Sequence, residues 1–299
     1  MAEADESLLR PDPAAVHRLW RAQARLQAAP WLHVEVARRM AERLPLLRKA
    51  PGLWIDWFAH AGGSAEAVQR CLPQARRLVV EADLALAQRS RDSAKGPWWR
   101  RLGRQTDPVH VGHVPDGPGA DLLWANMSLL ASSDAAGLMA HWHAALRDEG
   151  VVMLTTLGPD SLRELRALHR AQGWSPPHLP FMDMHDLGDL MVASGFADPV
   201  IDQEHLTLNW PEPRLVLDEL RTLGRNLHPR RHSGLRTPRW RQQWLDAMAE
   251  QAHQGRINLT FEVVYAQAFK VPRRLPATEV RIDVDVLRQR LRIGRIEGG

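Results

Sequence analysis

The chain has 299 residues, of which 44% are hydrophobic and 25% charged, values typical of a globular protein with a sizeable core. Its single cysteine, Cys71, excludes an internal disulfide framework and a metal site built from several thiolates. No apolar run approaches the roughly 18 residues of a membrane span, and the segment Met1–Arg10 lacks a signal-peptide pattern. We therefore expect a cytoplasmic protein without a membrane partner.

The basic residues are almost all arginines. Only three of the 39 basic residues are lysines, and the formal net charge is +4. A net charge this small, spread over the whole chain, does not by itself indicate binding to nucleic acid.

The first half of the chain alternates strands with helices. Residues 1–50 have apolar residues at helical spacing and predict an N-terminal helical cap, which Pro51-Gly52 ends. Short apolar runs then predict strands at Leu53–Phe58, Leu78–Val80, Val109–Val111, Asp121–Ala125 and Val151–Thr156. Helices are expected between them at Ser64–Cys71 and Ala135–Leu146. This alternation predicts a parallel sheet that is buried by helices on both faces.

The second half predicts a lid. Helices are expected at Asp160–Arg170 and Asp186–Ser194, and strands at Val200–Leu208 and Phe261–Phe269. Two more helical stretches, at 214–222 and 239–251, lie between those strands. The whole pattern predicts an α/β, Rossmann-like sheet in residues 51–271, with a helical lid inserted at about 211–255 and a charged tail at 272–299.

Candidate ligand-binding residues follow the first two strands, because ligands bind at the carboxyl ends of the strands in an open α/β sheet. Asp56, Gly62 and Gly63 belong to the first turn, and Asp83 lies about 20 residues after Gly62. A glycine-containing turn followed by such an acid is typical of nucleoside binding, since a carboxylate can accept hydrogen bonds from both ribose hydroxyls. An aspartate at a strand end more often serves only in a turn or as a helix cap.

Three further stretches carry a family resemblance. They are residues 155–166 (TTLGPDSLRELR), residues 183–190 (DMHDLGDL) with Gly195-Phe196 and Asp198-Pro199-Val200 after them, and residues 262–266 (EVVYA). Together with the turn after the first strand, they resemble class I S-adenosylmethionine-dependent methyltransferases and, more closely, the malonyl-carrier-protein O-methyltransferases of biotin synthesis. The resemblance covers residues 15–270 and implies the methyltransferase form of the Rossmann-like sheet.

The resemblance also implies a cofactor site for S-adenosylmethionine. Matching positions are Asp56, Gly62, Gly63, Asp83 and Asn126, the last of which directly follows the fourth predicted strand. The implied cofactor-binding residues are therefore these five.

Four departures from the family pattern surround the same pocket. Phe58 and His60 occupy the first two glycine positions of the motif D-x-G-x-G-x-G, and Val111-Gly112-His113 stands where an adenine-binding acid is expected. Leu26-Gln27 and Leu130-Ala131 replace a Tyr-Asp pair and a Gln-Trp pair. Because a side chain takes up ligand space where glycine allows close approach of the backbone, we expect the cofactor to be bound weakly or not at all.

No motif indicates metal or hydrolase chemistry. The histidines show no H-E-x-x-H spacing, and His141 and His143 lie two apart on a predicted helix and so point to different faces. No serine stands in a G-x-S-x-G turn. We therefore expect no metal site.

Basic residues are concentrated in the predicted lid, at Arg221, Arg225, Arg230, Arg231, Arg236, Arg239 and Arg241. The resemblance implies that this region faces an acylated carrier protein, and Arg221, Arg225 and Arg239 are the candidate substrate-binding residues. An acidic acyl carrier protein would be attracted by such a patch, and an arginine could bind the malonyl carboxylate through two hydrogen bonds. An exposed arginine-rich helix without any ligand explains the same pattern equally well.

Three functions remain open. A working enzyme would transfer a methyl group from S-adenosylmethionine to the free carboxylate of a malonyl thioester, mainly by positioning, because a carboxylate is already a nucleophile. A catalytically degenerate relative would keep the fold and act in binding or assembly; the residues at 58 and 60 favour this function. A nucleic-acid-binding protein, the least favoured, would use the arginines together with Trp98-Trp99, whose stacking surfaces are isolated in a predicted loop.

Overall fold

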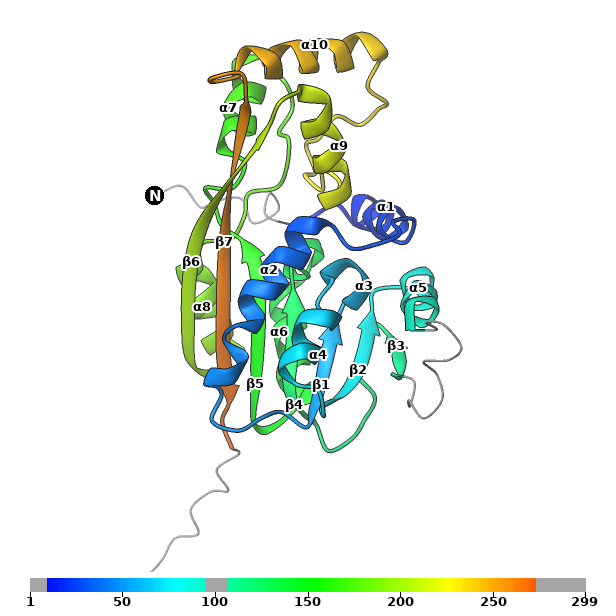
Figure 1. Ribbon diagram of the computed structural model, residues 1–299, viewed down its shortest axis with the longest axis vertical. Coiled ribbons are helices and arrows are strands. Elements are labelled where there is room, and N and C mark those ends of the chain that lie inside the picture. Colours follow the sequence, from blue (N-terminus) through cyan, green and yellow to red (C-terminus); the bar gives the residue numbers. More distant parts are fainter. Residues whose placement is uncertain (1–9, 95–106, 273–299) are drawn as a thin grey trace, which may run out of the picture.

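The computed structural model describes residues 10–94 and 107–272 and contains a mixed sheet of seven strands (Figure 1). The strands are β1 (Leu53–Trp57), β2 (Arg76–Glu81), β3 (Val109–Val111), β4 (Ala120–Asn126), β5 (Leu146–Leu157), β6 (Phe196–Trp210) and β7 (Ile257–Lys270). Their order in the sheet is β3-β2-β1-β4-β5-β7-β6. The first five pair in parallel, and β7 runs antiparallel between β5 and β6. The predicted Rossmann-like α/β fold is confirmed.

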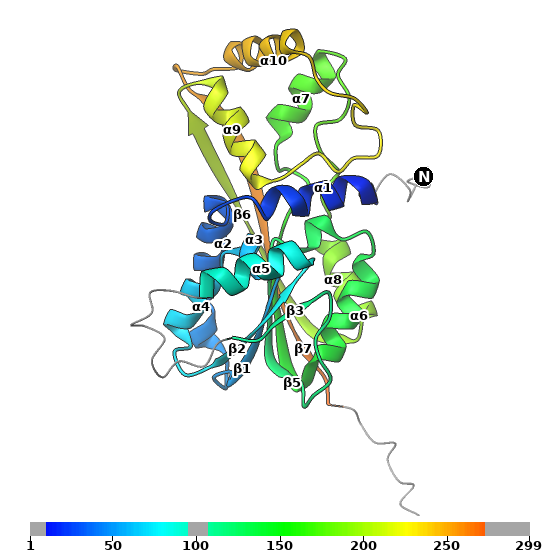
Figure 2. The same ribbon diagram turned by 90° about the vertical axis from the view of Figure 1, so that its right-hand side faces the viewer.

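Both faces of the sheet are covered by helices, because successive strand residues point to opposite faces. In β1, Trp54 packs into the core beneath α2 (Trp31–Ala41) and α4 (Ala65–Cys71), whereas Ile55 packs toward α6 (Ala135–Ala145) and α8 (Met184–Ala193). Figure 2 shows these two pairs of helices on opposite sides of the sheet. With both faces buried, a ligand site of this sheet can open only at the ends of its strands.

The carboxyl ends of β1 and β2 carry three more helices. These are α3 (Ala59–Gly62), α5 (Leu84–Ala94) and α1 (Pro13–Gln23), which crosses above the strand ends (Figure 2). Neither α3 nor α5 is expected from the sequence, since α3 is a single turn and α5 buries only Leu86 and Ala87 among its polar residues. Short 3-10 helices at Leu44–Leu46 and Leu129–Ala131 connect neighbouring elements.

A long hairpin of β6 and β7 carries the lid (Figure 1). Its pairing extends from Phe196 opposite Lys270 to Trp210 opposite Ile257. Helices α9 (Pro213–Leu223) and α10 (Pro238–Glu250) are inserted between the two strands, and α7 (Arg163–Ala171) packs beside them. Val216 and Trp244 join the apolar core of the α2 face, which therefore continues from the sheet into the lid.

Both strands of this hairpin are longer than the sequence predicts. The pairing of β6 shifts between Ala197 and Val200, where Asp198 has a left-handed backbone (φ 49°) and Pro199 follows. Proline is tolerated at bulges and edges because it cannot donate a ladder hydrogen bond. The bulge interrupts the apolar alternation, so the sequence pattern begins only at Val200.

The proposed division into residues 1–50, 51–271 and 272–299 stays a prediction. Trp98, Trp99 and the tail beyond residue 272 lie outside the described residues. None of the helices in the described ranges combines the length and the apolar character that a membrane-spanning segment requires.

Candidate functional site

Asp56 forms a buried ion pair in the interior of the fold. Its carboxylate is 1% exposed and lies 2.6 Å from Nη2 of Arg77, whose guanidinium stacks over the ring of Trp54. Arg77 also approaches Asp107, at 3.4 Å. The guanidinium of Arg77 on β2 therefore balances the charge of Asp56 on β1, and the ion pair links the two strands.

The turn after β1 is filled by an aromatic side chain. Phe58 adopts a left-handed backbone (φ 57°), a conformation that favours glycine, and its N–H donates to the carbonyl of Val80 at 2.6 Å. The Phe58 ring lies 5.5 Å from the Trp57 ring and 6.3 Å from the Trp20 ring of α1, measured between centroids. Phe58 thus has a backbone conformation typical of glycine, while its large ring covers the turn.

Asn126 links three elements beneath this turn. Its amide nitrogen donates to the carbonyls of His33 (2.8 Å) and Gly62 (2.6 Å), and its amide oxygen accepts from the Thr155 hydroxyl (2.6 Å). The side chain is 2% exposed. Both amide hydrogens and the oxygen are thus used inside the protein, so Asn126 has no free group to offer a ligand in this arrangement.

Gly63 is required by packing. It has φ 64°, and a Cβ there would lie 2.7 Å from Cβ of Ala29 and 2.9 Å from Cγ2 of Val34. His33 supports the same region through Nδ1, which lies 2.8 Å from the carbonyl oxygen of Ala61. The glycine therefore allows the segment before α2 to pack directly on the turn.

Two acids follow β2, and they have different roles. Glu81, the last residue of the strand, is 0% exposed; its Oε1 accepts from the His60 N–H (2.8 Å) and from the Ser90 hydroxyl. Its Oε2 is buried without a hydrogen-bond partner in the described part of the chain. Burial raises the pKa of Glu81 to about 7. Asp83 instead accepts from the N–H of Leu86 (2.9 Å) and caps α5.

Asp83, predicted to bind ribose, caps α5 in this structure, and Glu81 is the acid that accepts a hydrogen bond from the turn. The ribose-binding role of Asp83 stays a prediction. The distinguishing signal is the start of a helix at Leu84, which gives an aspartate one position earlier a capping role. The end of β3 offers no carboxylate, since Gly112 and His113 follow Val111.

The segment between α1 and α2 covers the same end of the sheet. Arg89 of α5 donates to the carbonyl of Leu26 at 2.6 Å, and Trp20 contacts Phe58 edge to face. Burial also lowers the pKa of the His60 ring. Leu26 and Gln27, which stand where the family pattern has Tyr-Asp, thus form part of a closed cover.

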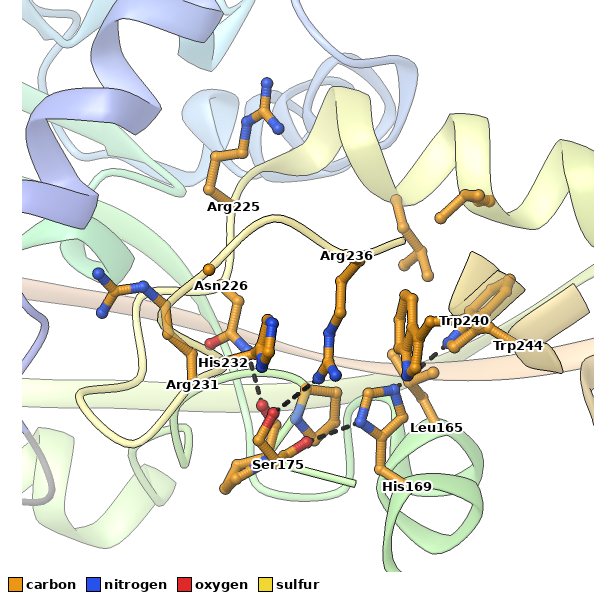
Figure 3. Close-up of a pocket in the computed structure, with 15 residues that line it drawn as sticks. Leu165, His169, Ser175, Arg225, Asn226, Arg231, His232, Arg236, Trp240 and Trp244 are labelled. Atoms are coloured by element: carbon orange, nitrogen blue, oxygen red, sulfur yellow. Dashed lines mark hydrogen bonds between the residues drawn. The ribbon is translucent and has the colours of Figure 1, made fainter. Parts of the chain in front are cut away.

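The lid contains a cavity of about 380 Å³, shown in Figure 3. Arg236 points into it, donates to the Ser175 hydroxyl (2.9 Å) and stacks 4.1 Å from the Trp240 ring centre. His169 lies on its floor, with Nε2 3.3 Å from the indole nitrogen of Trp244, and burial lowers the pKa of His169. The cavity therefore offers an aromatic wall, one guanidinium and a neutral histidine.

The three predicted substrate-binding arginines are not brought together. Arg225 lines this cavity, but its side chain extends away from it in Figure 3. Arg221 pairs with Asp218 at 3.0 Å on the exposed face of α9, and Arg239 is exposed on α10. Arg236 is the arginine that lies inside the cavity, and nothing in the spacing of the arginines distinguishes it.

A potential metal-binding group lies on the hairpin that carries the lid, where His205 of β6 pairs with Glu262 of β7. Asp160, His205 and Glu262 bring one ligand atom each within 4.8 Å of one another. Each of the three already has a polar partner: Glu262 accepts from the Asp160 N–H (2.7 Å), and the Asp160 carboxylate lies 3.7 Å from Arg163 and 3.4 Å from His205. These contacts explain the group without a metal ion.

Comparison with known proteins decides the family. The chain is 35% identical over 290 residues to a malonyl-[acyl-carrier protein] O-methyltransferase of Halorhodospira halophila, covering 94% of this chain and 97% of that protein. It is 31% identical over 261 residues to the enzyme of that name from Gallionella capsiferriformans, covering 85% and 89%. The chain belongs to the malonyl-[acyl-carrier protein] O-methyltransferase family.

Solved structures agree on the fold of this family member. The YcgJ protein of Bacillus subtilis superposes with a TM-score of 0.54 at 14% identity, covering 80% of this chain and 98% of that one. The Bacillus halodurans protein BH2331 gives 0.55 at 13% identity, with 78% and 99% covered. No family model matches the sequence.

S-adenosylmethionine is the methyl donor that membership of this methyltransferase family implies, and the residues at the strand ends do not fit it as they stand. The Phe58 ring fills the space between the turn and α1, Asn126 has all its polar atoms in use, and Glu81 is wholly covered. Glu81 Oε2 retains the acceptor that a ribose hydroxyl would need. The turn and its cover would both have to move before a nucleoside could reach it.

Proposed function

We propose that this chain is a catalytically degenerate member of its family, which binds an acidic acyl carrier protein and transfers no methyl group. One observation carries the proposal: Phe58 holds the left-handed position after β1 with its ring packed against Trp20. A ring in a turn that must pass close to a ligand excludes that ligand or forces the turn to move.

The binding half of the proposal rests on the lid. Relatives at 31–35% identity are named for malonyl-[acyl-carrier protein], and Arg225 and Arg239 are exposed in the lid. Such arginines attract an acidic surface. Arg236, inside the cavity beside Trp240, would bind the carboxylate of an acyl group that enters from the carrier, because a guanidinium can donate two parallel hydrogen bonds.

Calorimetry on the purified protein tests both halves. We expect no heat of binding from S-adenosylmethionine, and saturable binding of malonyl-loaded carrier protein that Arg236→Ala weakens. The matched control is Arg163→Ala, since Arg163 is exposed on α7 and lies outside the residues that line the cavity. Micromolar binding of S-adenosylmethionine would refute the loss of the cofactor; failure of the carrier protein to bind would refute the partner.

The second candidate is a working O-methyltransferase with a rearranged turn. Glu81 favours it, because its buried Oε2 lacks a partner at the strand end where class I methyltransferases, which the sequence resembles, hold ribose. Methyl transfer from S-adenosylmethionine to a malonyl thioester by the unmodified protein would establish this function in place of the degenerate one.

A further inference from the structure

A second hollow, of about 840 Å³, lies between α1 and the loop that joins α9 to α10. Five of the residues that line it are arginines, and His232 also lines it. The arginines are Arg18, Arg21, Arg25, Arg225 and Arg231. We call this hollow the arginine groove.

One wall of the arginine groove is a single face of α1 and its continuation. Arg18, Arg21 and Arg25 follow one another at helical spacing and are exposed. The opposite face of α1 buries Val16 and Leu19 in a small apolar core with Leu227 of the lid and Leu179 of the loop after α7. Packing of α1 against the lid thus fixes which way the three guanidinium-bearing side chains project.

The other wall supplies more positive charge. Arg225 and Arg231 extend away from the Trp240 cavity in Figure 3, and both also line the arginine groove. Asp12 is the one carboxylate in the lining; Arg231 lies 2.6 Å from it and lowers its pKa. In the described residues, Arg18, Arg21, Arg25 and Arg225 have no ion-pair partner.

We propose that the arginine groove binds a small molecule that carries two or more adjacent phosphate groups. Guanidinium groups that converge from two elements repel one another, and a multiply charged anion removes that repulsion while accepting several charge-assisted hydrogen bonds. A lone carboxylate would need only one of these arginines.

The dimensions favour a small ligand over a nucleic acid. Arg18 and Arg25 are seven residues apart in the chain, which corresponds to about 10 Å along a helix at about 1.5 Å per residue. That is the length of a short polyphosphate, whereas single-stranded nucleic acid is held along a track of about 4 to 16 nucleotides. The groove shares Arg225, Asn226 and His232 with the Trp240 cavity, so the remainder of the ligand has an adjoining place.

Calorimetric titration of the whole chain with tripolyphosphate, and separately with ATP, both without metal ions, tests the proposal. We expect one equivalent to bind, and Arg18→Ala/Arg21→Ala to weaken binding about tenfold or more, because it removes two charged donors. Arg70→Ala/Arg76→Ala is the control: both residues are exposed, lie away from the groove, and remove the same charge. Tighter binding of ATP than of tripolyphosphate would show that a nucleoside occupies the adjoining cavity.

Three outcomes would overturn the proposal. They are no binding of either compound, equal weakening in both double variants, and binding of a single-stranded oligonucleotide alone. The titration contains no carrier protein, so failure of the proposed carrier binding leaves its result unaffected. A positive result here would likewise not rescue the carrier proposal.

Discussion

At the scale of single residues, the proposed loss of the cofactor depends on Phe58. A non-glycine residue in the left-handed region costs on the order of 1–3 kcal/mol. The contacts of the ring with Trp20 and Trp57 and the hydrogen bond from its N–H to Val80 offset that strain. Phe58 thus has the left-handed backbone that favours glycine, and its ring covers the turn.

Clearing that space should restore part of the cofactor affinity. Overpacking costs about 1–3 kcal/mol per site, so two sites correspond to about 30-fold to more than 10⁴-fold in affinity. We expect Phe58→Gly/His60→Gly to bind S-adenosylmethionine measurably by calorimetry. Ala59→Gly/Ala61→Gly is the matched control, because it adds the same number of glycines and leaves both side chains in place.

The acid that serves the restored site can be identified in the same background. Glu81→Gln should weaken the recovered binding at least about tenfold, because a carboxylate accepts from two ribose hydroxyls more strongly than an amide. Asp83→Asn should leave it unchanged, since asparagine also caps a helix. The reverse pattern would return the role to Asp83.

Glu81 also makes the stability of the protein depend on pH. Burial raises its pKa from 4.5 to about 7, so the folded state holds a proton that the unfolded state has released. The free energy of unfolding should therefore fall as pH rises from about 4.5 through 7. The shift corresponds to about 3 kcal/mol at most. Between pH 5 and pH 8, the free energy of unfolding measured with urea should fall more in the unmodified protein than in Glu81→Gln. An equal fall in the two proteins would contradict this prediction.

At the scale of elements, the strands of the sheet could be predicted from the sequence better than the roles of the residues at the strand ends. The central parallel strands are recognisable because they are buried on both faces and read as apolar runs, as in Leu122–Ala125 of β4. The role of an acid at a strand end depends on where the next helix begins, and α5 has too few apolar residues to mark its start in the sequence. The position of Asp83 as the cap of α5 could not be predicted for that reason.

The helix-capping role of Asp83 can be measured directly. Asp83→Ala should lower the free energy of unfolding by about 1 kcal/mol, because it leaves an N–H at the start of α5 without its acceptor. Asp83→Asn should cost much less, since its side-chain oxygen can still accept that hydrogen bond. Equal losses in the two variants, measured by urea unfolding, would assign the effect to charge and contradict the cap.

Side-chain partners in the lid lay beyond what the sequence could predict. The spacing of the arginines of 221–241 does not show which of them lines a cavity, yet Arg221 is paired with Asp218 while Arg236 is stacked on Trp240. Which arginine enters the cavity is decided by the path of the loop between α9 and α10. Loop paths follow from tertiary packing and leave no periodic signal.

At the scale of the whole molecule, charge should control association with a carrier protein. Attraction between exposed charges is screened over about 10 Å at 0.1 M salt. We expect binding of an acidic carrier to weaken steeply as salt rises, and Arg225→Ala or Arg239→Ala to slow association more than it speeds dissociation. Surface plasmon resonance at several salt concentrations checks this. An association rate that changes neither with salt nor with these substitutions would contradict the proposed binding surface.

The docking of α1 on the lid has a consequence for biosynthesis. The N–H of Asp12 donates to the carbonyl of Leu227, and its carboxylate meets Arg231, more than two hundred residues further along the chain. At about 5–20 residues per second, a ribosome needs roughly 10–40 seconds to make that stretch. Throughout that time Val16 and Leu19 are without their final neighbours. The helix α1 therefore emerges long before the residues it packs against, and its apolar face must be kept from other partners until then.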